Sequence, residues 1–501
     1  MQPALGLTSE FGALLRRTRR RAGLSLRDLA AAVGYSESQL SRLETGHRQP
    51  DPAMVAGRLV PALGLTGSPA AQELIGLATR HGSAPPSEDR AARQLLALAR
   101  ARPALDDAAS LTSWLARIDR QGDALGHALE WYIRHDPAAG LGCVDALHPY
   151  WRARGHLAIG QIWVERLLAA VPSGAPEVAA GALTAGLLAY ELGDRRRAET
   201  LALRSLTQAR VCGDRGVAAN ALDLLGRAAY GQARYEEAEH RFDACCVLAA
   251  ELGDLPLLAR TLQHRAMVAK DCGQLDVADA LLLRSLALSR ALGDRSGEAY
   301  TLLNRSIVAY WRGDFVAAES LGGDALALQR ACGDRMGIAY ALDQVGMAAF
   351  RRGDCGRAPP LLNEALALFG AVGDRGGIAL IHQELGVVLL AIGDVAGAIA
   401  QQRAGLALAW AIEDRRRVAF CLEGLAAALA DAEPAESARL LGATQRLRAL
   451  IAAPLPPSEA EAMEALRARL YGALGGERFE RLVVEDAALD ATVMRQLSQL
   501  R

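Results

Sequence analysis

The feature that most constrains this chain is a 40-residue repeat that runs from residue 176 to about residue 440. A Gly-Asp pair recurs once in every repeat, and a second series of glycines lies half a repeat away from it. Alanine occupies one matching position throughout. The glycines of the Gly-Asp series are Gly213, Gly253, Gly293, Gly333 and Gly373, with Glu413 in register. The second series contains Gly193, Gly273, Gly313, Gly353 and Gly393, with Ala233 and Glu433 as exceptions. The alanines are Ala198, Ala238, Ala278, Ala318, Ala358, Ala398 and Ala438.

Each repeat is predicted to be a helical hairpin. Glycine at every half-period indicates the end of a helix, because glycine readily adopts the left-handed conformation that terminates helices. The small alanine lets two helices approach closely. Since a single hairpin cannot bury its own apolar face, the hairpins must stack. Pro359 and Pro360 fall inside one second helix, where we expect a displaced start or a kink.

Composition indicates an all-α chain with several parts. Apolar residues make up 51% of the sequence but aromatic residues only 5%, and strand-favouring residues are sparse beside alanine and leucine. A chain of 501 residues is also too long for one hydrophobic core. A set of helical domains or a repeat array is therefore expected.

The N-terminal segment is basic, although the formal net charge of the chain is only -1. Residues 11–50 contain eight arginines against three acidic residues, which gives a local charge of +5. Residues 23–46 predict two short helices joined by a tight turn, with Ser25 and Ser36 placed to cap the helices and Gly34 placed to end the first. A basic segment with this pattern suits double-stranded DNA.

Residues 9–66 resemble the XRE family of helix-turn-helix regulators, which have the lambda-repressor-like fold. The resemblance rests on the arginine-rich first helix over residues 11–20, Ala30 at the helix crossing, Gly34 at the turn, the Leu43-Glu44-x-Gly46 ending, Arg48, Pro50 and a helix expected over residues 59–65. Leu26 departs from the family, which usually carries a polar residue there that touches phosphate.

The resemblance implies two sets of DNA contacts. Residues expected to meet base edges are Glu37, Ser38, Ser41 and Arg42, and residues expected to meet phosphates are Arg17, Arg27, Ser36 and Arg48. The alternative is that these arginines form an ordinary solvated face. Heads of this type usually bind as dimers, so a homodimer on an operator is expected.

The repeat units resemble tetratricopeptide repeats in a longer-helix form, as in Ala221-Leu222 to Gly226 followed by Tyr235 and Ala238. Such repeats expose the first helix of each hairpin on a concave side, which implies a groove for a peptide or protein partner. The alternative is that its aromatic residues pack between repeats. The implied groove residues are Asn220, Asp223, Arg227, Tyr230, Arg260, Gln263, Lys270, Tyr300, Asn304, Tyr310, Trp311, Tyr340, Asp343, Phe350 and Gln383.

Two flanking segments resemble the tetratricopeptide arm of the large STAND signalling ATPases of actinobacteria. These are the Trp-rich residues 111–169, with the Trp151-Arg-x-Arg-Gly155-His156 run, and residues 433–498. The phosphate-binding motif Gly-x-x-x-x-Gly-Lys-Ser/Thr is absent from the sequence, and Lys270 is its only lysine. We therefore expect no ATPase module.

Catalytic motifs are also missing from the sequence. Neither His-Glu-x-x-His nor Gly-x-Ser-x-Gly occurs, and Asp343 and Glu384, which could meet in the groove, are expected by default to lie on a solvated polar face. The eight cysteines contain no Cys-x-x-Cys pair, which favours reduced, buried thiols over disulfides or zinc. We expect no enzyme activity, cofactor or metal. With neither an apolar span nor a signal peptide, the chain is expected to be cytoplasmic and not to contact membranes.

The sequence thus predicts five parts: an XRE-type domain over residues 1–80, a linker with one helix over 81–110, a Trp-rich helical segment over 111–175, repeats over 176–440 and a helical cap over 441–501. The predicted function is a sequence-specific DNA-binding transcriptional regulator whose arm senses a peptide or protein and controls DNA binding or dimer geometry. The alternatives are a scaffold with a degenerate DNA-binding head and an adaptor for a separate ATPase. Operator, sign of regulation, ligand and pathway are not indicated.

Overall fold

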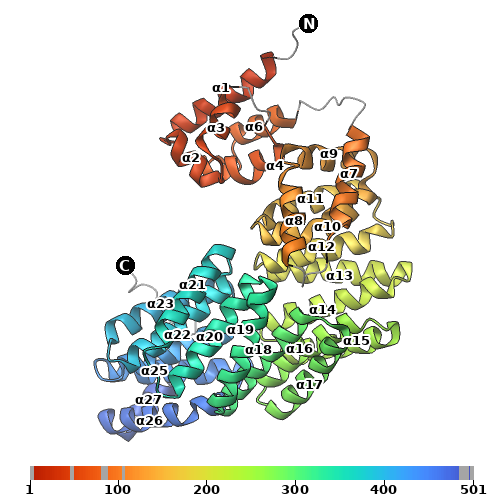
Figure 1. Cartoon of the computed structure of the whole chain (residues 1–501). Coiled ribbons are helices and arrows are strands. Elements are labelled where there is room, and N and C mark those ends of the chain that lie inside the picture. The colour runs from red at the N-terminus through yellow and green to blue at the C-terminus, as the bar shows by residue number, and fades with distance from the viewer. Residues whose placement is uncertain (1–4, 46–49, 80–87, 104–107, 485–495, 497–501) are drawn as a thin grey trace. The chain divides into compact units, whose positions relative to one another are not determined.

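The computed structural model describes residues 5–45, 50–79, 88–103, 108–484 and 496, and it divides into two compact units. Unit 1 comprises Met1–Pro103 and Ser110–Leu188, and unit 2 comprises Ala104–Ala109 and Ala189–Arg501. Regular secondary structure in the described residues is entirely helical, which confirms the predicted all-α class (Figure 1). Among these helices, none is both long enough and apolar enough to span a bilayer.

Unit 1 opens with a small bundle of helices around an apolar core. Phe11, Leu15, Leu29, Leu40 and Leu59 are completely buried in it. The bundle consists of α1 (Leu5–Arg21), α2 (Leu26–Val33), α3 (Glu37–Glu44), α4 (Pro52–Met54), η1 (Val55–Leu59), α5 (Val60–Ala62) and α6 (Pro69–Thr79).

The helix expected over residues 59–65 begins and ends earlier than the sequence predicts. α4, η1 and α5 follow one another without a break from Pro52 to Ala62. Pro52 is compatible with a helix start, because the first turn needs no amide donor from it. After Ala62 the chain turns at Gly64, whose φ of +67° ends the helical conformation.

The rest of unit 1 is a packed group of helices. α7 is the helix expected within the 81–110 linker, and it is anchored by two hydrogen bonds: the Tyr132 hydroxyl donates to the Ala92 carbonyl at 3.0 Å, and the Trp114 indole donates to the Leu98 carbonyl at 2.9 Å. Trp151 and Trp163 are buried. The helices are α7 (Glu88–Arg100), α8 (Ala108–Asp119), α9 (Asp123–His135), α10 (Pro137–Ala153), α11 (Leu157–Ala170) and α12 (Glu177–Glu191).

Unit 2 contains the repeats as stacked hairpins, in sequence order along the unit (Figure 1). The first helices are α14 (Arg215–Gly231), α16 (Leu255–Asp271), α18 (Arg295–Arg312), α20 (Arg335–Arg351), α22 (Arg375–Ala391) and α24 (Arg415–Leu429). The second helices are α13 (Arg195–Cys212), α15 (Tyr235–Leu252), α17 (Leu275–Leu292), α19 (Phe315–Cys332), α21 (Ala358–Val372), α23 (Val395–Ala411) and α25 (Pro434–Leu450).

The recurring Gly-Asp pair ends one helix and starts the next. Gly293, for example, has a φ of +67° and caps the C-terminus of α17. The side chain of Asp294 then accepts a hydrogen bond from the backbone N–H of Gly297 at 2.8 Å, which caps α18. The same aspartate cap recurs at Asp214, Asp254, Asp334, Asp374 and Asp414. The glycine role was predicted, and the aspartate role is an additional finding.

Two of the three exceptions in the glycine series hold the same strained conformation without glycine, whereas Glu433 has a φ of -136°. Ala233 and Glu413 both have a φ of +57°. We expect Glu413→Gly to stabilise unit 2 by about 1 kcal/mol, because the left-handed region costs a side-chain-bearing residue roughly 1–2 kcal/mol. The ion pair of Glu413 with Arg196 is long, at 3.7 Å, and exposed, so its loss matters little.

The matched control is Gly373→Ala, one repeat earlier, where φ is +78° and an added Cβ would meet no atom within 4 Å. This variant should lose about 1 kcal/mol by the same backbone effect. Urea denaturation followed by circular dichroism measures both. Changes of the same sign in the two variants would contradict the backbone explanation.

The prolines at 359–360 displace a helix start, as predicted. α19 and α23 begin directly after their capping residues Asp314 and Asp394, whereas α21 begins only at Ala358, after a turn. The two prolines then occupy the first turn of α21, where their missing N–H groups are not needed.

The stacked hairpins curve until distant repeats touch within unit 2. Asp271 at the end of α16 forms an ion pair with Arg416 of α24, and the guanidinium of Arg195 in α13 donates to the Ile412 carbonyl. Two further helices, α26 (Pro457–Leu474) and α27 (Gly476–Val484), follow the last hairpin. Arg351 of α20 forms an ion pair with Glu459 of α26 at 3.2 Å. The cap therefore reaches the inner side of the repeats.

Candidate DNA-binding surface and ligand cavity

The recognition helix α3 is built as the sequence predicts. Ser36 and Gln39 form a reciprocal cap. The backbone N–H of Gln39 donates to Ser36 Oγ at 3.2 Å, and the backbone N–H of Ser36 donates to Gln39 Oε1 at 2.9 Å. Leu40 and Leu43 are buried, with 0% and 1% exposure. Ser36 therefore holds the start of α3, so its hydroxyl is already engaged as an acceptor.

The candidate base-contacting residues share one exposed face of this helix. Glu37, Ser38 and Arg42 are exposed, and Ser41 is half-buried. Arg17 on α1 and Arg27 on α2 are also exposed, as phosphate contacts require. Arg48 lies outside the described residues.

Some of the basic charge in this domain is neutralised internally. Arg19 is almost buried and forms two hydrogen bonds with the buried Glu44, from Nε at 2.6 Å and from Nη2 at 3.1 Å. Its Nη1 donates to the Leu24 carbonyl at 2.9 Å, and Arg16 adds a further contact to Glu44 at 3.2 Å. Glu44 was noticed only as part of the Leu-Glu-x-Gly motif, and it proves to tie α1 to the end of α3.

The second candidate site is a cavity of about 390 Å³ within unit 2. Its wall comes from the first helices of successive hairpins, which agrees with the predicted concave side, and the cap helix α26 closes one part of it. The volume falls in the range of roughly 300–1,000 Å³ that is typical of ligand pockets. The predicted groove residues that line it are Tyr230, Lys270, Tyr310, Trp311, Tyr340, Asp343 and Gln383.

The other predicted groove residues lie outside the cavity lining, and several are used by contacts between repeats. Asp223 is buried and accepts hydrogen bonds from Thr261 at 3.2 Å and from His264 at 2.8 Å. The guanidinium of Arg227 lies over the Tyr190 ring at 4.2 Å. The residues outside the lining are Asn220, Asp223, Arg227, Arg260, Gln263, Tyr300, Asn304 and Phe350.

A basic and aromatic cluster forms one side of the cavity. The Lys270 ammonium lies 3.7 Å from the centre of the Trp311 ring and 2.5 Å from the Asp271 carboxylate. Asp271 also accepts from the Tyr230 hydroxyl at 2.7 Å and from Arg416. Burial lowers the pKa of Lys270 to about 8, although the adjacent Asp271 opposes this shift. Each cation here already has an anionic partner.

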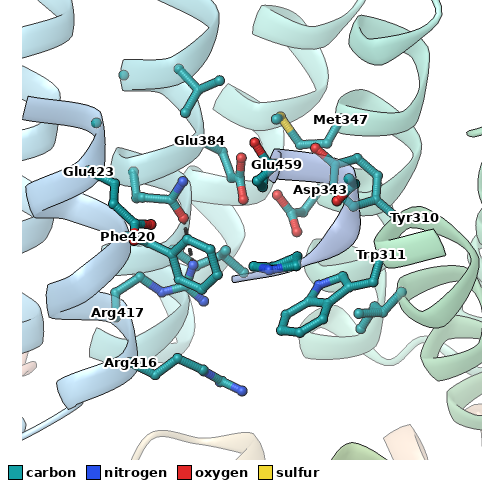
Figure 2. Close-up of a pocket in the computed structure, with 18 of the residues that line it drawn as sticks. Tyr310, Trp311, Asp343, Met347, Glu384, Arg416, Arg417, Phe420, Glu423 and Glu459 are labelled. Carbon is teal, nitrogen blue, oxygen red and sulfur yellow. Dashed lines mark hydrogen bonds between the residues drawn. The ribbon is translucent and has the colours of Figure 1, made fainter. Parts of the chain in front are cut away.

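An acidic pair forms the other side. Figure 2 shows the carboxylates of Asp343 and Glu384 close together, with Glu459 beside them. Arg416 and Arg417 lie below these carboxylates in the view. Asp343 has 0% exposure and Glu384 is half-buried, so the expectation of a solvated polar face is wrong for Asp343. Burial raises the pKa of Asp343, and burial together with the charge of Asp343 raises the pKa of Glu384. The pair therefore retains a proton near neutral pH.

Several residues of the cavity are not among the groove residues expected from the sequence. Some lie in the same register as residues that were chosen: Arg351 stands one full repeat after Trp311, and Glu423 stands one full repeat after Gln383. Extending the repeat register would have found them. The α26 residues carry no such signal, because the cap lies outside the repeats. The missed lining residues include Met347, Arg351, Arg416, Arg417, Phe420, Glu423, Ser458, Glu459 and Met463.

The structure shows no metal-binding arrangement in its described residues, where no three His, Cys, Asp or Glu side chains are grouped to hold an ion. All eight cysteines are free thiols, but only Cys143, Cys245, Cys332 and Cys421 are buried as expected, and Cys212 is exposed. Burial raises the pKa of Cys143 and Cys421 to about 12, so these thiols stay protonated.

Comparison with known families identifies the N-terminal part. The model of the family described as "Helix-turn-helix domain" matches residues 10–72. These residues form a helix-turn-helix DNA-binding domain. The match covers the arginine-rich α1, the capped α2 and α3 and the helix from Pro52 to Ala62, and it agrees with the resemblance found in the sequence. Among curated proteins, none matches this chain.

Solved structures show the fold of the arm. A Rap protein complexed with Competence and Sporulation Factor has a TM-score of 0.54 and 12% identity, over 73% of this chain and 98% of that chain. A STAND protein with a tetratricopeptide-repeat sensor from Pyrococcus horikoshii has a TM-score of 0.42 and 11% identity, over 97% of this chain and 72% of that chain. The stacked hairpins of unit 2 and the likeness to the Rap protein show that the helix-turn-helix domain is followed by a tetratricopeptide-type α-solenoid.

Proposed function

We propose that this chain is a sequence-specific transcriptional regulator whose solenoid binds a ligand in the cavity and thereby controls DNA binding. The observation that carries the proposal is the exposed face of α3 in a helix-turn-helix domain, where Glu37, Ser38 and Arg42 reach solvent beside a basic surface. The lined cavity supports the sensing part. The Rap protein of similar fold was solved with Competence and Sporulation Factor, which supports a ligand for an arm of this kind. The proposal includes no catalytic step.

The proposal also includes a homodimer. An eight-residue recognition helix buries too little surface for tight specific binding by itself, and domains of this type act in pairs on two half-sites. A ligand in the solenoid would then act by changing the spacing of two domains. DNA fragments recovered with the full-length protein should contain paired half-sites.

Arg42→Ala is expected to weaken binding to the recovered site by about 1–3 kcal/mol and to leave non-specific binding almost unchanged. The reason is that a guanidinium directed at a base edge discriminates between sequences, whereas phosphate contacts do not. Titrations of the full chain with the recovered site and with a scrambled duplex measure the two affinities.

Arg27→Ala is the matched control, because Arg27 is equally exposed but lies on α2. This variant should weaken binding to both duplexes equally, and it should reduce the slope of log affinity against log salt concentration by about one. An equal loss on both duplexes for Arg42→Ala would remove Arg42 from base recognition. A wild-type chain without any sequence preference would favour the scaffold function instead.

A further inference from the structure

We propose that the solenoid cavity binds its ligand through a cationic nitrogen group, an ammonium or a guanidinium, that docks between Asp343 and Glu384. This inference rests on the proposed sensing function and adds the chemical class of the ligand. It is drawn from the polar groups that the cavity leaves without partners.

On the described cavity lining, the buried side-chain atoms without a hydrogen-bond partner are three carboxyl or amide oxygens, the Nε donor of Arg417 and the hydroxyl of Ser458. Asp343 Oδ1, Gln344 Oε1 and Gln402 Oε1 are buried and have no hydrogen-bond partner among the described residues. The orientation of both amides is fixed by their donor ends: Gln344 Nε2 donates to Asp343 Oδ2 at 2.9 Å, and Gln402 Nε2 donates to the Gln383 carbonyl at 3.0 Å. A buried acceptor without a hydrogen bond costs free energy. A ligand that supplies N–H or O–H donors to these oxygens would therefore be favoured.

The protein's own cations are engaged elsewhere. Arg351 pairs with Glu459, with N–O distances of 3.2 and 3.3 Å, and Arg417 Nη1 donates to Gln383 Oε1 at 2.7 Å. Within the described part of the chain, neither arginine forms an ion pair with Asp343 or Glu384. Arg351 and Arg417 act on Glu384 only through space, so neither neutralises the two facing carboxyl groups by direct contact, and the pair favours a directly bound cation from outside.

The rest of the lining suits a hydrocarbon stem. Ile307, Met347, Leu380, Val387 and Met463 contribute apolar surface around the acidic pair. An apolar wall with a few polar groups at one end is the usual arrangement of a small-ligand pocket. The cavity is therefore matched to a short side chain or small molecule with one charged nitrogen end.

Binding of a cation should displace the proton that the acidic pair retains. Burial raises the pKa of both carboxyl groups, so a proton competes with the ligand near neutral pH. A ligand that binds the ionised pair gains affinity as pH rises through this range, by up to tenfold per pH unit for one displaced proton. The other groups that face the pair are Tyr310, Arg351, Arg417, Cys421 and Glu459.

The test uses the full chain and three small probes: n-butylguanidinium, n-butylammonium and the neutral isostere N-butylurea. Dissociation constants from NMR titrations between pH 6 and pH 8.5 are compared. We expect at least one cation to bind at least tenfold more tightly than the urea, with affinity that increases with pH. The stronger cation identifies the nitrogen group. Equal binding of the urea and both cations, or tighter cation binding at low pH, would overturn the inference.

Variants separate the acidic pair from general surface charge. Asp343→Asn and Glu384→Gln keep the shape of each side chain, and each should reduce affinity for the cation at least tenfold and flatten the pH dependence. Asp324→Asn, an exposed carboxylate on α19, should change nothing. Circular dichroism verifies that each variant is folded, and unchanged cation affinity in both folded pair variants would refute the site.

The cavity experiment and the DNA experiment fail independently. If the Arg42 variant behaves as expected but neither cation binds, the proposed regulator function is supported and the proposed ligand class is wrong. If a cation binds at Asp343 and Glu384 but the chain shows no preference for any DNA sequence, the site stands and the regulator is wrong.

Discussion

Asp271→Ala should destabilise unit 2 by about 3–5 kcal/mol, because it leaves the buried Lys270 ammonium and the half-buried Arg416 guanidinium without their shared anion. Asp271 has 0% exposure, lies 2.5 Å from the Lys270 ammonium, and accepts from the Tyr230 hydroxyl and from Arg416. Since these partners come from α14, α16 and α24, the carboxylate joins repeats that are far apart in the sequence. Urea denaturation of the full chain, followed by far-UV circular dichroism, measures the loss.

The control for this prediction is Asp279→Ala on α17. Asp279 pairs with Arg305 at 2.9 Å, but both side chains are about one quarter exposed, so we expect a loss of about 1 kcal/mol or less. If Asp271→Ala and Asp279→Ala shift the denaturation midpoint equally, the Asp271 carboxylate does not have the stabilising role between distant repeats that the structure indicates. Asp271→Ala should also weaken ligand binding in the cavity, because its partners Lys270 and Arg416 line the cavity.

Arg19→Ala should destabilise the helix-turn-helix domain by a similar amount, about 3–5 kcal/mol, and abolish DNA binding through unfolding. The side chain of Glu44 is only 4% exposed, and its hydrogen bonds to Arg19 raise the pKa of that guanidinium. Without Arg19, a buried carboxylate keeps only the longer contact from Arg16. Thermal unfolding and DNA titration of the full chain are the two measurements.

Two companion variants distinguish this structural role from simple loss of positive charge. Arg20→Ala removes an exposed arginine from the same helix and should leave the stability almost unchanged. The double variant Arg19→Met with Glu44→Leu replaces the pair by apolar groups and should recover most of the stability. Failure of the double variant to recover, or a large loss in Arg20→Ala, would contradict the role assigned to the Arg19–Glu44 pair.

Local features of the fold were predictable where a short stretch of sequence decides the backbone. Ser25, Gly34 and Ser36 cap and end the helices of the DNA-binding domain as predicted, because capping involves atoms only a few residues apart. The displaced start of α21 followed from its two prolines in the same way. The helix expected over residues 59–65 was misplaced because its apolar pattern alone gives no clear start.

The two candidate sites were predictable to different degrees. The exposed residues of α3 follow from helix periodicity, and Glu37, Ser38 and Arg42 lie where the pattern placed them. Repeat register correctly selected Tyr310, Trp311 and other cavity residues. It could not select Glu459, because no period links the cap helix to the repeats. Nor could it show that Asp223 and Gln263 are used within the stack, since their partners lie on neighbouring helices.

The sequence by itself determined the all-α class, the hairpin period, the helix ends and the face of α3 that meets solvent, because each depends on neighbours within a few residues or on one repeating unit. Only the tertiary structure decided that the repeats curve until Asp271 meets Arg416, that Glu459 joins the cavity wall, and that the half-buried Glu384 lies beside the buried Asp343. Small rotations between successive hairpins add up along the solenoid, and no local pattern encodes their sum.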